Sequence, residues 1–496
     1  MVTNKGKIYL PETLCRVISA LPDVKGIDKS FLAYLIHLIH HQQQKKKSNA
    51  SGWCHLSSKI LKGYEYVLEG IHYSYKKHLD HLENHKLIER SKSYSTVKNR
   101  AKGHKINEQL LKAEDVLLPV ALTPRLGAKV SIRQEQRKKN ARRMTPHLTR
   151  WLDKNGFDFD KETAICHTNS LFDLKEDTRI ARLRVIEGFD TALYSRDGKD
   201  GRLHTNFTRM PSDLRRFVTY QGESLHAIDL PNSQPLMLSI LINTLIVGLD
   251  REMDCNKPSI ESLTKRIGKI LKQYCVIADN RTNHNKKVYA TANNVITNIK
   301  EISYALASIM LSNTFKEFDI QEIKHFHRLS SDKQLYQYVG NKLLEGGIIG
   351  NTGKQYTVLL TDEELKTPSL KTFDSIRACG KEITFYALYS SSKNNNKAVK
   401  ALKELFPAIF RIVDTIKNAI EGNYEVFSWL LLNMESKFIL DYSTKRIAKN
   451  YSAMPLITIH DSIVTTESDI TLLKQEVETD FCKYFGVELS LATEAW

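Results

Sequence analysis

Cysteine is scarce in this chain, and no two cysteines stand at the spacing of a paired motif. Seven cysteines are scattered over 496 residues, and none forms a C-x-x-C pair. This pattern favours neither a zinc ribbon nor a disulfide framework, and reduced thiols are usual in the cytosol. No apolar run approaches the roughly 20 residues that a membrane helix needs, and the N-terminus lacks the apolar stretch of a signal peptide. We therefore expect a cytoplasmic protein with no membrane partner.

Acidic residues are also in short supply. The chain has 73 Lys and Arg against 56 Asp and Glu, which gives a net charge of +17 and a pI near 9.3. A surface with this excess attracts polyanions and lowers the cost of holding a phosphate backbone. The charge is typical of a nucleic-acid-binding protein, and solubility alone is the plainer alternative.

The length allows two or three domains, and no internal repeat is present. The first domain, residues 1–115, is predicted to hold helices followed by a β-ribbon. Its signals are Leu32, Leu35, Ile36 and Ile39 at helical spacing, an amphipathic helix at 71–88, and strands at 88–95 and 99–107. Helices followed by a basic ribbon resemble a winged helix, a module that usually binds DNA and is also used for protein contacts.

Two further regions follow. Residues 116–200 are predicted to form a basic linker and a thumb-like region, in which the segment 125–150 is dense in Arg and Lys. A charge run of this kind is usually a solvated face or a linker, and tracking of a phosphate backbone is the alternative. Residues 201–496 form the largest region, with a polar insertion at about 251–330.

Two acids stand where strands are predicted to end. The apolar lead-in to Asp229 indicates a buried strand that ends at this acid, before a helix rich in Leu and Met. Residues 455–467 predict a β-hairpin with Asp461 at its tip. Two carboxylates on adjacent strands can hold two Mg²⁺ ions, which prefer oxygen ligands and keep waters and phosphates in their shell. Taken alone, each acid is more often an ordinary turn residue.

A helical stripe at 377–389 complements the two acids. Arg377, Lys381, Phe385 and Tyr389 are spaced four apart, so each step drifts only about 40° around an α-helix. Two cations followed by two aromatics are unlike a core stripe, because buried cations are costly unless paired. Cations that take phosphates, and rings that meet a sugar and a base, suit a nucleoside triphosphate. An amphipathic helix with snorkelling cations is the plainer alternative.

These segments together resemble one enzyme superfamily. The pattern R-x-x-x-K-x-x-x-F-x-x-x-Y is similar to motif B, the O-helix, of family A DNA polymerases. The resemblance implies that Arg377 and Lys381 bind the incoming triphosphate, that Phe385 packs near its sugar, and that Tyr389 lies by the templating base pair. The family has Gly after that Tyr, where this chain has Ser390.

Asp229 resembles the acid of motif A, and the pair His460-Asp461 resembles motif C. Family A DNA polymerases carry a Glu five residues after the first acid, which excludes a ribose 2′-hydroxyl, and this chain has Gln234 there. They usually carry a second Glu after the motif C Asp, whereas Ser462 is similar to the single-subunit phage and mitochondrial RNA polymerases. These two positions leave the choice of sugar open, and the motif B Phe favours deoxynucleotides.

Three more segments extend the resemblance over roughly residues 200–496. The segment 201–217 is similar to the family's G-R-L-S/T motif, which implies that Arg202 contacts the primer–template, as does His460 of motif C. The helix at 427–442 resembles a palm helix that touches template and primer, with Asn433 and Glu435 as the candidates. Residues 332–346 resemble the helix that leads into the fingers.

The expected fold is therefore α+β: a right-hand polymerase with an antiparallel palm sheet and helical fingers, preceded by a winged-helix-like α/β-ribbon domain. The expected function is a template-directed DNA polymerase that adds deoxynucleotides to a primer 3′ end, with two Mg²⁺ ions or Mn²⁺ as cofactors. Its expected partners are a DNA primer–template, or an RNA template, and nucleoside triphosphates. Nothing before residue 200 resembles a 3′–5′ exonuclease, so no proofreading is expected.

Two alternatives remain open from the sequence. One is a single-subunit RNA polymerase or primase, which Ser462 favours. The other is a non-catalytic DNA-binding replication initiator, which the N-terminal domain favours. Compactness and the missing exonuclease suggest by analogy a replication protein of a phage, plasmid or other mobile element, in the cytoplasm of a bacterial host.

Overall fold

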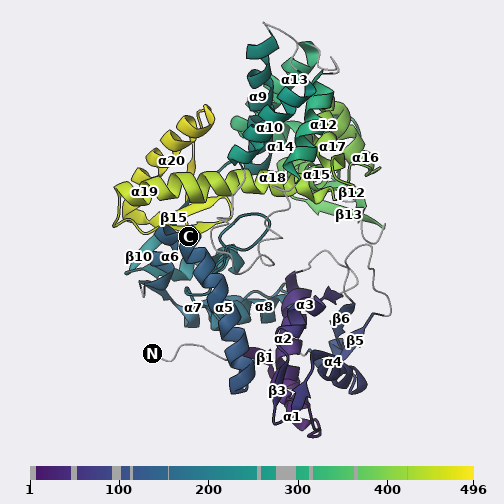
Figure 1. Ribbon diagram of the computed structural model, residues 1–496, viewed down its shortest axis with the longest axis vertical. Helices are drawn as coiled ribbons and strands as arrows, with labels where there is room; N and C mark the ends of the chain where they lie inside the picture. Colours follow the sequence, from purple (N-terminus) through teal and green to yellow (C-terminus); the bar gives the residue numbers. More distant parts are fainter. Residues whose placement is uncertain are drawn as a thin grey trace.

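The computed structural model describes ten stretches of the chain, and its fold is α+β. These stretches are 7–45, 53–91, 102–111, 115–154, 156–253, 259–274, 298–311, 317–361, 367–421 and 423–496. Helices predominate, and every strand pairing among these residues is antiparallel. Buried apolar side chains gather in an N-terminal core and a larger main core. In Figure 1 the N-terminal elements lie at the bottom, and the helices numbered α9 to α17 lie at the top.

The N-terminal unit combines short strands with four helices. Its elements are β1 (Lys7–Pro11), α1 (Glu12–Ala20), α2 (Lys29–Lys45), β2 (Cys54–His55), α3 (Ser58–Lys62), β3 (Tyr66–Leu68), β4 (Ile71–Tyr73), α4 (Tyr75–Asn84), β5 (Ile88–Arg90), β6 (Gly103–Ile106) and β7 (Leu117–Ala121). The helical spacing in α2 is confirmed, since its four predicted apolar positions are buried. Strands β2, β6 and β5 form one sheet, β1 pairs with β7, and β3 with β4.

The helix predicted at 71–88 is wrong at both ends. Its first residues form strand β4, in which Tyr73 pairs with Tyr66 of β3. The helix begins only after Ser74, whose hydroxyl accepts a hydrogen bond from the N–H of Lys76 as an N-cap. Both predicted ribbon strands exist over shorter spans, as β5 and β6, and residues 92–101 between them lie outside the described residues.

Helix α5 (Pro124–Met144) carries the basic segment and joins the two cores. Leu126 and Val130 near its start belong to the N-terminal core, whereas Ala141 near its end belongs to the main core. Its cations contact both sides: Arg125 donates to the carbonyl of Val67 (2.9 Å), Arg133 lies over the ring of Tyr64 (5.5 Å), Arg137 pairs with Asp197 (2.8 Å), and Arg142 pairs with Asp153 (3.0 Å). Much of this charge therefore serves to hold the chain together.

A central sheet positions the two candidate acids. Its strands, in spatial order, are β14 (Ile457–Ile459), β15 (Ser462–Thr466), β10 (Glu223–Asp229), β9 (Val218–Tyr220) and β8 (Phe157–Phe159), and β16 (Ala492–Ala495) also pairs with β10. The surrounding helices are α6 (Pro146–Asp153), α7 (Lys161–Asn169), α8 (Glu176–Glu187) and α20 (Ile470–Phe485). The predicted hairpin at 455–467 and the predicted strand ending at Asp229 are both confirmed.

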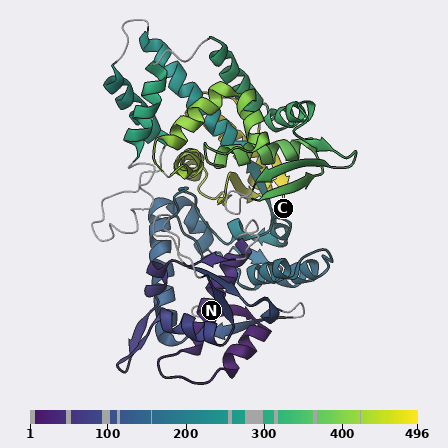
Figure 2. The same ribbon diagram turned by 90° about the vertical axis from the view of Figure 1, so that its right-hand side faces the viewer.

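The upper part of the molecule is a helical body with one small sheet, seen from the side in Figure 2. Its helices are α9 (Ser233–Met253), α10 (Ile260–Tyr274), α12 (Ile299–Leu311), α13 (Glu317–Ser331), α14 (Leu335–Glu345), α15 (Ile376–Tyr389), α16 (Lys397–Leu405) and α17 (Pro407–Asn418). Its strands are β11 (Gly350–Asn351), β12 (Tyr356–Thr361) and β13 (Pro368–Phe373). Much of the predicted insertion is thus ordered, because α10, α12 and α13 bury apolar residues in the main core.

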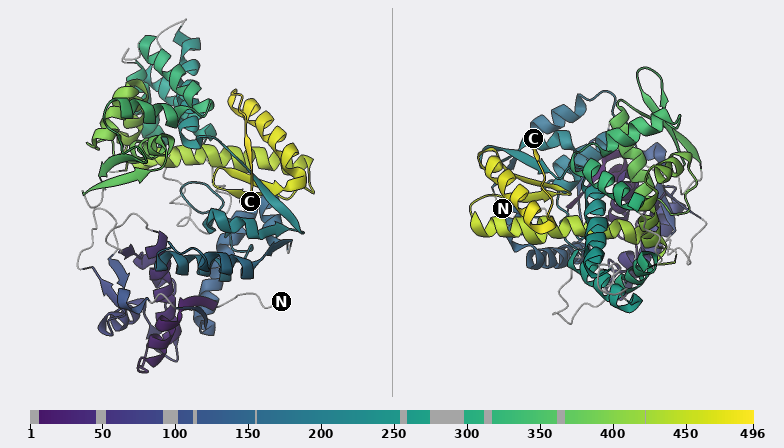
Figure 3. Two further views of the ribbon diagram at one scale, coloured as in Figure 1. Left: turned by 180° about the vertical axis from the view of Figure 1, so that it is seen from behind. Right: turned by 90° about the horizontal axis from the view of Figure 1, so that it is seen from above.

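One long helical rod crosses the molecule between these parts, as Figures 1 and 3 show. It consists of α18 (Glu425–Ser436), a π-helical turn (Lys437–Ser443) and α19 (Thr444–Asn450) without a break. The helix α18 contacts α9 and α15, and the π-helical turn contacts α20. No described helix combines the length and the low polarity required to cross a bilayer.

Helices α14 and α15 cross so closely that glycine is needed on both. A Cβ atom on Gly380 would lie 2.1 Å from the carbonyl oxygen of Tyr336, and one on Gly340 would lie 2.5 Å from that of Ile376. Both neighbours are backbone atoms, so they move only if a helix shifts. The crossing therefore fixes α15, which carries the predicted triphosphate stripe.

Replacing Gly380 by alanine should lower the free energy of unfolding by about 2 kcal/mol or more, because the added methyl group overpacks the crossing. The matched control is Gly268→Ala in α10, where the nearest atom, Ser303 Oγ, lies at an ordinary 3.4 Å. That variant should be neutral or up to about 1 kcal/mol more stable, since alanine favours a helix. Urea unfolding followed by circular dichroism compares the two, and equal stabilities would contradict the prediction.

Candidate active site

Asp229 and Asp461 lie side by side at the ends of two neighbouring strands. Strand β10 ends at Asp229, which stands opposite Ser462 in the register with β15. His460 and Asp461 form the two-residue turn between β14 and β15. The backbone N–H of Leu230 donates to the carbonyl of Asp461 at 3.2 Å, which ties the turn to the end of β10. Two acids that are 232 residues apart in the sequence are thus held in one place by backbone pairing.

Each carboxylate receives one serine hydroxyl. Ser462 Oγ donates to Asp229 Oδ1, and Ser233 Oγ donates to Asp461 Oδ2 at 2.9 Å. Asp229 is exposed and Asp461 is partly exposed. An ionised carboxylate offers about four lone-pair sites, so one hydroxyl each leaves both acids able to take further ligands.

The turn itself is strained at His460. Its φ of 54° lies in the left-handed region, which costs a non-glycine residue of order 1–3 kcal/mol. Hydrogen bonds on both sides of the turn, within the hairpin and to Leu230, fix this conformation. Burial lowers the pKa of His460, and the nearby Arg202 cation lowers it further. The neighbouring Asp461 carboxylate raises this pKa, and the two lowering effects outweigh it.

Behind the acids lies a buried polar network centred on Glu435. This side chain is fully buried in α18, and its Oε1 accepts hydrogen bonds from Nε (2.9 Å) and Nη2 of Arg202. Its Oε2 accepts from Nε2 of Gln234 at 2.7 Å. The third arm of the guanidinium, Nη1, lies 3.4 Å from Nδ1 of His460. The structure therefore brings together four of the residues predicted from the sequence.

Burial and charge oppose each other in this network. Burial raises the pKa of Glu435 to about 7, the Arg202 cation opposes that shift, and the Asp461 carboxylate adds to it. Burial alone would lower the pKa of Arg202, but Glu435, Asp461 and Asp200 together more than offset this effect, so the guanidinium stays charged. Glu435 is the neutralising partner of a cation that reaches the hairpin turn.

The predicted stripe lies on one face of α15, as its spacing requires. Arg377 and Lys381 are exposed, and Phe385 and Tyr389 are partly exposed. The rings of Phe385 and Tyr389 stack with centroids 5.6 Å apart, and Lys381 Nζ lies 5.9 Å from the Phe385 ring. Arg377 lies over the ring of Tyr336 at 5.8 Å. The expected order along the helix, cations first and rings last, is present.

The ring end of this stripe faces the acids. Burial raises the pKa of Tyr389, and the negative charges of Glu435 and Asp461 add to the shift. Burial likewise raises the pKa of Tyr336, with Asp461 as the next cause. Tyr389, on α15, and Tyr336, on α14, are both near enough to Asp461 for its charge to act on their phenols.

A buried lysine holds the C-terminal end of α15, where the two rings lie. Lys417 of α17 donates through Nζ to the carbonyls of Ala387 and Ser390, each at 2.8 Å. A cation at the last carbonyls of a helix also suits the helix dipole. Ser390, the residue that replaces the Gly of the resembled motif, is itself buried at this helix end. Lys417 thus fixes the ring end of the stripe, and the close crossing with α14 fixes its cation end.

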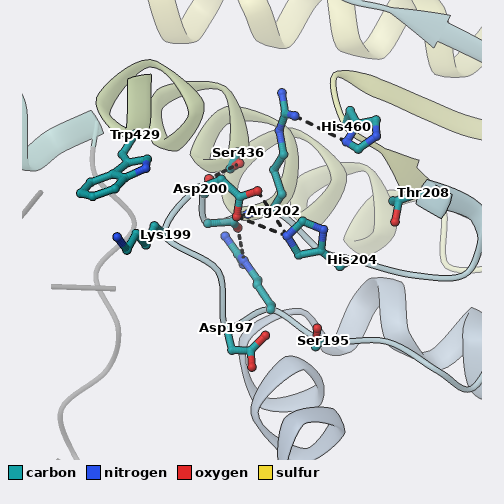
Figure 4. Close-up of polar contacts among 12 residues, drawn as sticks. Ser195, Asp197, Lys199, Asp200, Arg202, His204, Thr208, Trp429, Ser436 and His460 are labelled. Atoms are coloured by element: carbon teal, nitrogen blue, oxygen red, sulfur yellow. Dashed lines mark hydrogen bonds and ion pairs between the residues drawn. The ribbon is translucent and has the colours of Figure 1, made fainter. Parts of the chain in front are cut away.

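Asn433 is buried and does not face solvent. Its Nδ2 donates to the carbonyls of Lys199 and Trp429, each at 2.7 Å. Ser436, one turn on, donates to the carbonyl of Asp200 at 2.9 Å. Figure 4 shows this loop against α18, with Lys199 beside Trp429 and Arg202 reaching toward His460. Asn433 therefore holds the loop that carries Arg202.

The residues present fit Mg²⁺. No group of three or more His, Cys, Asp or Glu side chains that could hold a metal is found where the structure is described. Mg²⁺ is commonly bound by only one or two carboxylates, with waters and substrate phosphates as its other ligands. Asp229 and Asp461 supply that all-oxygen pair.

Three features of the site were not predicted from the sequence. Tyr336 lines the space before the acids, and its signal was its place in the segment 332–346. Arg215 lies near Asp229, and no local pattern marks it. Burial lowers the pKa of Arg215, and the charge of Asp229 opposes that shift by a smaller amount. Lys199 Nζ lies 3.8 Å from the ring of Trp429, a contact across more than 200 residues that no local motif encodes.

No protein-family model matches the chain, and no curated protein is significantly similar to it. The function must therefore be argued from the site itself.

Proposed function

We propose that this protein is a template-directed nucleic-acid polymerase that extends a primer 3′ end with deoxynucleotides. The observation that carries the proposal is the meeting of two acids, from distant segments, opposite a helix with cations and rings on one face. Asp229 and Asp461 come together through backbone pairing, and Tyr389 of α15 is close enough to feel the charge of Asp461. This arrangement suits a metal-dependent nucleotidyl transfer better than any use of the acids as turn residues.

The proposal extends to the fold as a right-hand polymerase. In it the central sheet with α20 is the palm, and the helical body α9 to α17 forms the fingers. The antiparallel sheet, the acids at its strand ends and the packing of α18 against both α9 and α15 support this assignment. The family resemblance of the motifs supports it independently of the fold.

The side chains divide the work of binding. Lys381 and Arg377 neutralise the triphosphate and the negative charge that develops on the pyrophosphate as it leaves. Phe385 and Tyr389 present ring faces for the sugar and the nascent base pair. Arg202, held by Glu435, points toward the turn where the primer end would lie. Positioning of the two reactants accounts for much of the rate in such a transfer.

Mg²⁺ held by Asp229 and Asp461 would lower the pKa of the primer 3′-hydroxyl and stabilise charge on the transferred phosphate. Ser462 and Ser233 orient the two carboxylates by hydrogen bonds to one oxygen of each. The hydrophobic sheet beneath keeps both acids at the strand ends.

The N-terminal unit is proposed to be a winged-helix-like module that binds nucleic acid. Its order α2, β2, α3, α4, β5, β6, interrupted by the hairpin β3–β4 between α3 and α4, and its sheet order β2-β6-β5 support this assignment. Lys76 and Lys77 are exposed near the start of α4, the helix that such modules place in a groove. A use in protein contacts is the competing role, and a loss of nucleic-acid binding when Lys76 and Lys77 are replaced by alanine in the full chain would separate the two.

The proposal is tested by incorporation of labelled nucleotides with the purified chain. Primed and unprimed DNA and RNA templates are each offered dNTPs or NTPs, with Mg²⁺ or Mn²⁺. We expect template-dependent extension of primed DNA with dNTPs, complete loss with EDTA, and recovery when Mg²⁺ is added back. Absence of incorporation in every combination, with an intact and folded chain, would overturn the proposal.

The same experiment decides between the two enzymatic readings. The hydroxyl of Ser462 at Asp229 is the feature that favours an RNA polymerase or primase. Faster incorporation of NTPs than dNTPs, or synthesis on unprimed templates, would establish that alternative in place of DNA polymerisation.

A further inference from the structure

The hydrogen bonds around Glu435 connect the two sides of the site. One carboxylate oxygen is taken by Arg202, from the loop before the palm sheet, and the other by Gln234, from the start of α9. Gln234 directly follows Ser233, the hydroxyl donor to Asp461, and Arg202 reaches His460, which directly precedes Asp461. Through Arg202 and Gln234, the buried Glu435 side chain is thus connected to the residues on two sides of Asp461.

The geometry fixes which way each partner points. The Gln234 amide donates through Nε2 to Oε2 of Glu435, so its NH₂ group is turned toward this carboxyl group. The amide oxygen of Gln234 is then turned away from Glu435, and it has no partner within the described residues although the side chain is buried. In the same way, two guanidinium nitrogens held on Glu435 leave Nη1 directed to the turn.

The burial of Glu435 rules out a direct contact with nucleic acid in this conformation. Its side chain is fully buried, and both oxygens are already bonded within the protein. This differs from the sequence prediction, which grouped Glu435 with residues that touch primer and template. Its effect on a substrate must pass through Arg202 and Gln234.

We infer that Glu435 is a positioning residue, whose carboxylate orients the Arg202 guanidinium and the Gln234 amide together at the nucleotide and primer end of the site. The inference rests on the proposed function. The proposed site needs one negative charge in the pair formed by residues 234 and 435. Among the described residues, Arg202 is the only cation that the carboxylate of Glu435 contacts.

Three variants test this assignment by steady-state primer extension. Glu435→Gln removes the charge and lets the amides of 234 and 435 turn freely, so kcat/KM for the incoming nucleotide should fall at least about tenfold. Gln234→Glu places two carboxylates against one guanidinium beside Asp461, so it should lose as much or more. The exchange variant, Gln234→Glu with Glu435→Gln, keeps one carboxylate and the hydrogen bonds, and should recover most of the loss.

Recovery in the exchange variant is the result that a merely structural role would not give. The matched control is Glu425→Gln, an exposed Glu on the first turn of the same helix, which should keep the wild-type constants. Melting temperatures are measured for every variant, and the expected activity pattern should not follow them. If Glu435→Gln does not fold, Glu435→Asp keeps the charge while shortening its reach, and should lower kcat/KM in the same direction.

The outcomes separate the inference from the proposed function. Wild-type kcat/KM in Glu435→Gln, or losses in the two single variants that simply multiply in the exchange variant, would overturn the positioning role while polymerase activity stands. A folded wild type that incorporates no nucleotide would overturn both.

Discussion

Replacing Asp461 by asparagine should slow nucleotide incorporation at least ~10³-fold, which corresponds to about 4 kcal/mol of transition-state stabilisation. Asparagine has the same shape, and its side-chain oxygen can still accept the hydroxyl of Ser233. The backbone bond from Leu230 to residue 461 is also retained. The substitution therefore removes one negative charge from the proposed Mg²⁺ site and little else.

Binding and stability should respond differently from the rate. Primer–template affinity, measured by fluorescence anisotropy at fixed salt, should change by less than about threefold, because phosphate contacts dominate such affinities. Stability should be equal or slightly higher, since the Asp461 charge lies near that of Glu435 and raises its pKa. The single-turnover rate is the measurement that decides.

Asp158→Asn is the matched control for this substitution. Asp158 lies on β8, in the same sheet as Asp229, and it is exposed. The exchange has the same chemistry and the same change in net charge, so incorporation should stay within about twofold of wild type. A rate for Asp461→Asn within tenfold of wild type would contradict the assignment of this acid to catalysis.

The sequence predicts best those parts of the site that local patterns encode. An apolar run ending in an acid predicted β10, and two apolar runs around a short turn predicted the hairpin. The four-residue spacing of Arg377, Lys381, Phe385 and Tyr389 predicted which face of α15 they share. In each case the periodicity of one strand or one helix decides which residues share a side. Asp229, Asp461 and the four stripe residues could be named for that reason.

Contacts between distant segments are what the sequence does not encode locally. Gln234 and Glu435 are 201 residues apart, and neither segment alone shows that they meet. The burial of Glu435 depends on how α18 packs against α9, which follows from the whole core. The predicted length of the helix at 71–88 failed for a related reason, because pairing with β3 outweighed the helical pattern at its start.

The basic segment at 125–150 has a structural role that its composition alone did not predict. Its density of Arg and Lys predicted a solvated linker or a phosphate-tracking surface. In the structure, several of these cations on α5 form contacts within the protein, among them the ion pair of Arg137 with Asp197. The net charge of +17 therefore overstates the cations that remain for a polyanion.

Replacing Lys381 by alanine should raise KM for the incoming nucleoside triphosphate about 10- to 100-fold. A charged hydrogen bond to phosphate is worth about 1.5–3 kcal/mol, and Lys381 is exposed on the stripe with its ammonium 5.9 Å from the Phe385 ring. Because Lys381 is assigned to the triphosphate and not to the primer–template, primer–template affinity should be nearly unchanged. Initial rates over a range of nucleotide concentrations give KM and kcat separately.

A charge-matched control distinguishes a phosphate contact from the general field of a basic protein. Lys400→Ala removes an exposed cation from the neighbouring helix α16 and should leave KM within about twofold. Lys381→Arg keeps the charge and should retain most of the affinity for the triphosphate. If Lys381→Ala and Lys400→Ala raise KM equally, the stripe acts only through net charge. α15 would then be an ordinary amphipathic helix, and the nucleotide would have to bind elsewhere.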